Sequence, residues 1–185
     1  MIRKLVVILF VSLFVKYATA QNSCLSFKTN LVSWAVLEPN LQLEYGFARH
    51  FSIALGGGYG WWGFNGRQNA LQNWNVGGSI NYYFSKNTPF TRHHLGVSGQ
   101  GGQFDMKWGR TGKRGKYKAV GIVYGYTWQI SRSFLIDAGL GAGYIQTSYT
   151  KYKWLPKSDC FMRLEDVAKR VPGLMQLNVS FIYRL

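Results

Sequence analysis

The segment most informative about the fold is Leu177-Asn178-Val179-Ser180-Phe181-Ile182-Tyr183-Arg184-Leu185. Its odd-numbered positions carry only large apolar or aromatic side chains, and Asn178, Ser180 and Arg184 share the opposite face. Because successive side chains of a β-strand point to opposite sides, this alternation predicts a strand with one apolar and one polar face. Such strands are typical of β-barrels that cross a membrane.

The same alternation recurs upstream. We expect strands over residues 25–37, 41–47, 51–61, 74–84, 95–105, 120–130, 134–144 and 174–185. The first of these segments is the least regular, and the fifth is rich in glycine. The pattern predicts an all-β fold, an eight-stranded antiparallel transmembrane β-barrel, because a closed sheet leaves no unpaired backbone edge in a bilayer.

The composition of the polar face indicates which face meets lipid. Alternating strands could equally form a soluble barrel that binds lipid inside. A soluble barrel would present Lys, Glu, Thr and Asp to water, but the second face here is mostly Gly, Ser, Asn and Gln. Small polar residues fit the narrow interior of an eight-stranded barrel, so we expect the bulky apolar side chains on the outside, against hydrocarbon.

The links between the expected strands alternate in length, except that the first link expected on the outer side, over residues 38–40, is short. Short links cover residues 48–50, 85–92 and 131–133, and longer links cover residues 63–73, 107–117 and 150–173. Outer-membrane barrels have short periplasmic turns and longer extracellular loops. The alternation therefore predicts that both termini lie in the periplasm.

Residues 1–20 have the features of a cleaved export signal. Arg3 and Lys4 precede an apolar run, and Ala18-Thr19-Ala20 matches the small-x-small pattern at which a signal peptidase cuts. The apolar run is too short to span a bilayer as a helix. We expect residues 1–20 to be a signal peptide and residues 21–185 to form one barrel domain in the outer membrane of a Gram-negative bacterium.

Basic residues far outnumber acidic ones. The chain has 22 Lys and Arg residues against 7 Asp and Glu residues, and 19 of the basic residues lie beyond the expected signal peptide. An exported protein with this charge meets lipopolysaccharide phosphates and acidic glycans first. We therefore expect outer-membrane lipid, lipopolysaccharide or a surface glycan as partners, and no nucleic acid.

Four charged residues fall on the polar face of the strands. They are Lys28, Glu44, Asp137 and Arg184, on the first, second, seventh and eighth expected strands. Closure makes these four strands neighbours, and isolated charges in a narrow interior are costly. We expect one buried ion-pair network that fixes the strand register, and a proton or ion path is the functional alternative.

Basic residues crowd two of the longer links. The candidates for binding an anionic ligand are Lys107, Arg110, Lys113, Arg114, Lys116, Lys118, Lys151, Lys153 and Lys157. On the outer rim such residues would meet lipid A phosphates or an anionic polysaccharide, although a charged loop can also simply be solvated. Residues 159–170, ahead of Pro172 and Gly173, are expected to form a short helix over the barrel mouth.

Catalytic and metal-binding signatures are missing. His93 and His94 lack a third ligand in the sequence, and the Gly139-Leu140-Gly141-Ala142-Gly143 run follows strand periodicity and opens no helix. We therefore expect no enzyme activity, catalytic residues, metal or cofactor. Cys24 and Cys160 are expected at opposite ends of the barrel, too far apart for a disulfide.

Three short motifs resemble a known family. Lys28-Thr29-Asn30-Leu31, the segment from Glu38-Pro39-Asn40 to Glu44, and Gly56-Gly57-Gly58-Tyr59 are similar to motifs of small exported Bacteroidota proteins catalogued as domain of unknown function 3575. Members of this family are often encoded beside fimbrial subunit genes. The resemblance implies an outer-membrane barrel with no known activity and no catalytic residues.

We expect a monomeric barrel with a structural or cell-surface interaction role. Its basic outer segments would contact anionic glycan, lipopolysaccharide or a fimbrial partner. One alternative is a lipid-modifying outer-membrane enzyme, which needs a Ser, His or acidic cluster at the outer rim. The other alternative is a soluble lipid-binding barrel.

Overall fold

The computed structural model describes residues 24–64, 69–85, 90–155 and 160–185. The expected signal peptide, the expected start of the barrel domain at residue 21, and the candidate Lys157 lie outside the described residues. Within the described ranges, no helix has both the length and the apolar character needed to cross a membrane.

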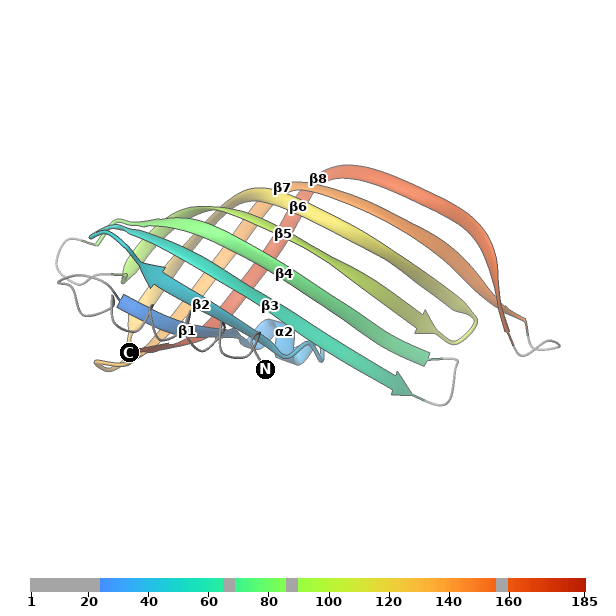
Figure 1. Ribbon diagram of the computed structural model, residues 1–185, viewed down its shortest axis with the longest axis horizontal. Coiled ribbons are helices and arrows are strands. Elements are labelled where there is room, and N and C mark those ends of the chain that lie inside the picture. Colours follow the sequence, from blue (N-terminus) through green and yellow to red (C-terminus); the bar gives the residue numbers. More distant parts are fainter. Residues whose placement is uncertain (1–23, 65–68, 86–89, 156–159) are drawn as a thin grey trace, which may run out of the picture.

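Eight strands form a single closed sheet (Figure 1). They are β1 (Cys24–Asn30), β2 (Asn40–Gly46), β3 (Phe51–Phe64), β4 (Asn69–Tyr83), β5 (Arg92–Trp108), β6 (Thr111–Gln129), β7 (Phe134–Leu155) and β8 (Cys160–Arg184). A short helix, α2 (Leu31–Ala35), separates β1 from β2. Each strand pairs antiparallel with the next, and β8 pairs with β1. The prediction of an all-β fold with eight antiparallel strands is confirmed.

The two faces of the sheet differ in the predicted sense. On β8, Leu177, Phe181 and Tyr183 are 46%, 47% and 44% exposed, whereas Ser180 between them is 5% exposed. Exposed large apolar side chains come from every strand between β2 and β8. The apolar flank therefore faces outward and the small polar flank lines the inside of the ring.

The strands are much longer on one side of the ring than on the other. β1 and β2 have 7 residues each, whereas β7 has 22 and β8 has 25. The hairpins of β3 to β8 consequently extend well beyond α2 (Figure 1).

The expected long outer loops are largely strand, which corrects the sequence interpretation. Only Gly109 and Arg110 join β5 to β6, and the pairing of β6 with β7 continues to Thr111 and Lys153. Gly109 has φ +56°, a conformation that glycine adopts without strain in a tight turn. Polar residues on both faces made these segments resemble loops, but the backbone pairing of a hairpin needs no apolar face.

The helix expected over residues 159–170 is wrong. From Cys160 onward the chain belongs to β8, which pairs with β7 from Leu155 to Ile145 in this region. That part of β7 is rich in Thr and Tyr, which favour strands, and its backbone groups need partners. Strand pairing therefore outweighs the local helix signal, and Val167 and Val171 lie in the hairpin.

The first expected strand, over residues 25–37, is shorter than the alternation indicated. β1 ends at Asn30, whose side-chain oxygen accepts a hydrogen bond from the backbone N–H of Val32 at 3.1 Å. Asparagine is a favoured N-cap because this bond satisfies a free donor of the first helical turn. The chain therefore turns into α2, and Trp34 lies on this helix with half of its surface exposed.

Candidate functional site

A buried ionic cluster connects strands on both sides of the β1–β8 pairing that closes the ring. Lys28 of β1 places its Nζ 2.8 Å from Glu44 Oε2 on β2 and 3.8 Å from Asp137 Oδ2 on β7. The three side chains are 2% to 7% exposed. β1 lies between β2 and β8, and β7 follows β8, so closure of the sheet brings these strands together.

Glu44 is further neutralised by hydrogen-bond donors from β3 and β4. Ser52 and Tyr83 donate their hydroxyl groups to Glu44 Oε1, the latter at 2.9 Å, and the Asn81 amide donates to the same oxygen at 3.1 Å. Because a buried carboxylate without partners is costly, this complete set of donors holds Glu44 in one position.

Asp137 has its own partners on β5 and β6. The Thr127 hydroxyl donates to Asp137 Oδ1 at 2.8 Å, and His94 Nδ1 lies 3.6 Å from the same oxygen. At that distance the His94 nitrogen makes no hydrogen bond, but its ring packs against the Tyr83 ring with centroids 5.0 Å apart. The cluster therefore extends around most of the ring.

The structure brings three of the four predicted interior charges together. The ion pairs of the cluster run between Lys28, Glu44 and Asp137, whereas Arg184 lies near the end of β8, opposite Ser26, and is half-buried. His94 and Tyr83 were missed as interior residues. The alternation around Leu95 places His94 inward, and this signal was present in the sequence.

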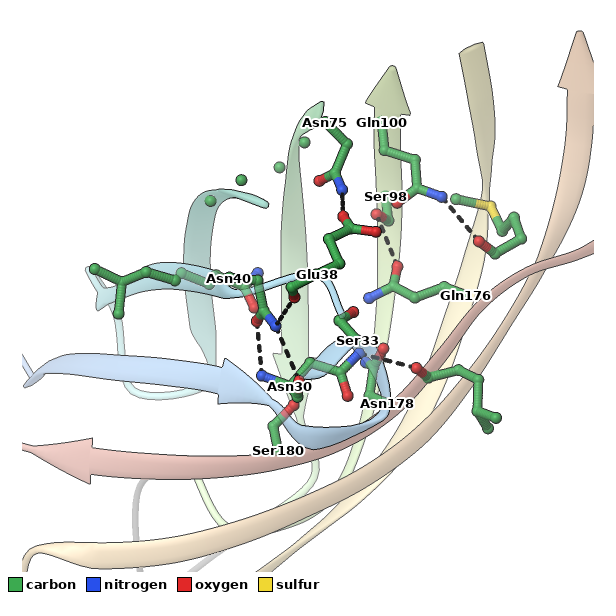
Figure 2. A pocket seen from close by; sticks show the side chains of 18 of the residues that line it. Asn30, Ser33, Glu38, Asn40, Asn75, Ser98, Gln100, Gln176, Asn178 and Ser180 are labelled. Atoms are coloured by element: carbon green, nitrogen blue, oxygen red, sulfur yellow. Dashed lines mark hydrogen bonds between the residues drawn. The ribbon is translucent and has the colours of Figure 1, made fainter. Parts of the chain in front are cut away.

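A polar cavity of about 240 Å³ lies beside α2 inside the ring (Figure 2). Amide and hydroxyl side chains line most of it, and the Gln100 amide donates to the backbone oxygen of Met175 at 2.8 Å across the interior. Asn30 and Asn40 close one side, because the Asn40 side-chain amide accepts a hydrogen bond from the Asn30 backbone N–H at 2.7 Å and donates one to the Asn30 backbone oxygen at 2.9 Å. The cavity is suited to water or another small polar molecule.

Glu38 anchors the link between α2 and β2 to the opposite wall. Asn73 and Asn75 of β4 each donate a side-chain amide hydrogen bond to its carboxylate (Figure 2 shows the bond from Asn75). Burial raises the pKa of Glu38, and the hydrogen bond from Asn73 acts in the opposite direction. A side chain at Gly58 would overlap the Glu38 carboxylate, so this close approach requires glycine there.

The predicted basic residues lie on both faces of the β5–β6 and β7–β8 hairpins. Tyr117 lines the interior cavity, so its neighbours Lys116 and Lys118 face outward. Lys113 is in register with Lys151, and its Nζ lies 5.9 Å from the centroid of the Tyr149 ring. Of the remaining candidates, Lys107 and Arg114 lie near Asp105, Arg110 lies in the β5–β6 turn, and Lys153 pairs with Thr111.

Acids at the tip of the β7–β8 hairpin compensate part of the local charge. Lys151 Nζ lies 3.0 Å from Glu165 Oε2, and Arg163 forms an ion pair with Asp166. The Thr150 hydroxyl also donates to Asp166, and these hydrogen bonds lower the pKa of Asp166. The tip is therefore close to neutral, in contrast to the outward face of β6.

His93 and His94 point to opposite sides of the sheet. His93 is exposed and bonds the Tyr124 hydroxyl at 2.6 Å, whereas His94 is buried inside. The two rings therefore cannot share a metal ion. Among the described residues, no group of three or more His, Cys, Asp or Glu side chains could hold one, and Cys24 and Cys160 are free thiols.

One family model matches essentially the whole chain. It covers residues 5–185 and is described as "Protein of unknown function (DUF3575)". Comparison with the curated proteins and with the solved structures gives no match.

Proposed function

The chain belongs to the DUF3575 family of proteins of unknown function, and on this premise we propose that it is an outer-membrane β-barrel with a structural or cell-surface interaction role. Residues 1–20 direct its export, and both termini lie in the periplasm. Its basic outer hairpins contact anionic glycan, lipopolysaccharide or a fimbrial partner. It works as a monomer and without catalysis.

The observation that carries the proposal is the outward apolar belt. On β6 and just after it, the outward side chains from Val120 to Ile130 are all apolar or aromatic. The ten residue steps between them span about 33 Å of strand, or about 25 Å of height at the ~40° tilt usual for such barrels. This height agrees with the apolar band that a transmembrane barrel presents to hydrocarbon.

Aromatic side chains at the ends of the belt support the same proposal. Trp128 and Tyr183 lie near the end that carries the short turns, and Tyr59, Trp61 and Trp74 lie near the opposite border; all are exposed. Tyr and Trp favour the membrane–water interface because their rings have both an apolar body and a polar group. A soluble barrel has no reason to expose two such borders around an apolar surface.

The side chains that fill the interior favour a structural role for the barrel rather than transport through it. Buried side chains of the Lys28 cluster cross the ring at one level, and α2 with Glu38 occupies it at another. An eight-stranded barrel has an interior only wide enough to be filled by its own side chains. The cluster then fixes the strand register, because a shift of one strand by one residue would turn its charged side chain toward lipid.

Fractionation of cells that produce the chain tests this proposal. We expect the protein in the outer-membrane fraction, resistant to extraction by carbonate, and with a gel mobility that changes on heating because the folded barrel survives unheated detergent. Release into the soluble periplasmic fraction without detergent would overturn the proposal in favour of a soluble barrel.

A further inference from the structure

The outward faces of β6, β7 and β8 change from apolar to polar at one register row. The last apolar row consists of Val120, Tyr144 and Pro172. The next outward row consists of Lys118, Gln146 and Arg170. These rows are about 6.6 Å apart along the strands, so the positive charges begin directly at the border of the belt.

The polar surface continues outward from this border. Lys116 is in register with Ser148, and Arg114 is in register with Thr150. These residues line a shallow hollow of about 390 Å³ on the outward face, together with Gln103 and the ion-paired Arg163 and Asp166. The hollow thus combines cationic groups with hydroxyl and amide donors, which is the set that binds phosphate oxygens.

Three of these cations have no acidic partner. Across the described ranges of the chain, no ion pair involves Lys116, Lys118 or Arg170. On the inner face, Lys151 is paired with Glu165 and Lys113 lies over the Tyr149 ring. Three cations without an acidic partner therefore lie on the face that adjoins the apolar belt.

We propose that Lys116, Lys118 and Arg170 bind the phosphate groups of a glycolipid embedded in the same membrane as the barrel. This inference rests on the proposed function, since it requires the belt to lie in a bilayer. A lipid whose acyl chains pack against Val120 and Tyr144 presents its headgroup phosphates at the level of the cations. A soluble glycan has no such reason to prefer the outward face.

Two variants with equal charge loss test the site. The outward variant carries Lys116→Gln, Lys118→Gln and Arg170→Gln, and the matched control carries Lys113→Gln, Lys151→Gln and Lys169→Gln on the inner face of the same hairpins. Both are refolded in detergent and titrated with bisphosphorylated lipid A and with lipid A from which the phosphates have been removed. A heat-dependent change of gel mobility like that of the unaltered protein shows that each variant is folded. If the outward triple variant fails to fold, the single variant Lys118→Gln replaces it in the titrations.

We expect the outward variant to lose affinity for bisphosphorylated lipid A on the order of 100-fold, because each basic residue near a membrane surface contributes about fivefold. The single variant should lose about fivefold, and the inner-face control should stay within about twofold of the unaltered protein. With dephosphorylated lipid A the three proteins should bind alike.

Several results would overturn the inference. The first two are an equal loss of lipid A affinity in both triple variants and equal binding of the two lipid A forms by the unaltered protein. The others are binding of phosphatidylglycerol as tight as that of bisphosphorylated lipid A, and the same dependence on the three outward cations for the soluble polyanion polygalacturonate. Insertion of the unaltered protein into phosphatidylcholine vesicles is measured in parallel. If the protein inserts but does not discriminate between the two lipid A forms, only the phosphate site is ruled out. If it fails to insert, the proposed function is ruled out.

Discussion

Lys28 Nζ lies 2.8 Å from Glu44 Oε2 inside the ring, and neither side chain is more than 7% exposed. The two residues come from adjacent strands that are joined only through α2 and a short link. A buried ion pair seldom adds stability over an apolar pair of equal volume, but it penalises any arrangement that separates its members. This pair therefore specifies which residues of β1 and β2 face the interior.

Removing one member of this pair should destabilise the barrel more than removing both. We expect Lys28→Met to lower the free energy of unfolding by about 3 kcal/mol, because it leaves Glu44 and Asp137 without their cation. The double variant Lys28→Met with Glu44→Gln should recover part of that loss. Urea unfolding in detergent, followed by tryptophan fluorescence, measures both, with the exposed Lys116→Met as control. Equal stability of Lys28→Met and the control would contradict the role of the pair.

The cluster could be predicted only in part from the sequence. Closure of the sheet makes the strands of Lys28, Glu44 and Asp137 neighbours, and alternation places all three residues inside. Tyr83 and His94 each follow a residue of the same type, in Tyr82-Tyr83 and His93-His94. Residue type therefore cannot tell which member of each pair faces inward, and the decision rests on strand alternation, which places Tyr82 and Leu95 outward.

Phe90 should make Gly46 intolerant of any side chain. The Phe90 ring is 8% exposed and packs edge-on against Tyr83 with centroids 5.3 Å apart, and a Cβ atom at Gly46 would overlap it. We expect Gly46→Ala to lower the free energy of unfolding by about 2 kcal/mol through overpacking. In a Phe90→Ala background the same change should cost much less. Equal costs in the two backgrounds, measured by urea unfolding, would show that the ring is not the cause.

Glu38 should give the barrel a stability component that falls as pH rises. Burial raises the pKa of Glu38 above its ordinary value of 4.5, so the folded chain holds this proton more tightly than the unfolded chain. That contribution is complete below pH 4.5 and is lost as pH rises through the folded pKa. Glu38→Gln removes the titration, so the stability of the unaltered protein relative to this variant should decrease as pH rises from 4.5 through the folded pKa of Glu38.

The exposed Glu165→Gln at the hairpin tip is the control for this pH series, because Glu165 lies outside the interior. The readout is the urea midpoint at each pH, reported by the tryptophans near the link. Trp62 donates a hydrogen bond to the Leu37 backbone oxygen at 2.6 Å, so its fluorescence senses the Glu38 segment. A difference between Glu38→Gln and the unaltered protein that does not change with pH would contradict the prediction.

The outer hairpins show where sequence patterns are least informative. Alternation between apolar and polar residues marks a strand only where one face meets hydrocarbon or a core. Beyond the apolar belt both faces of β6 meet water, so Lys113, Arg114 and Lys116 carry no periodic signal. The strand continues because each backbone group of β6 finds its partner on β5 and β7. Which cations face outward could therefore be known only from the register.

The two cysteines should react differently in intact cells. Cys160 is exposed at the start of β8 in the outer β7–β8 hairpin, whereas Cys24 is half-buried at the start of β1, near the opposite end of the barrel. In the proposed topology a membrane-impermeant maleimide reaches Cys160 from outside the cell and does not reach Cys24. We expect labelling of the unaltered protein and of Cys24→Ser, and none of Cys160→Ser until the cells are permeabilised. Labelling of Cys24 but not Cys160 in intact cells would reverse the orientation and place the basic hairpins in the periplasm.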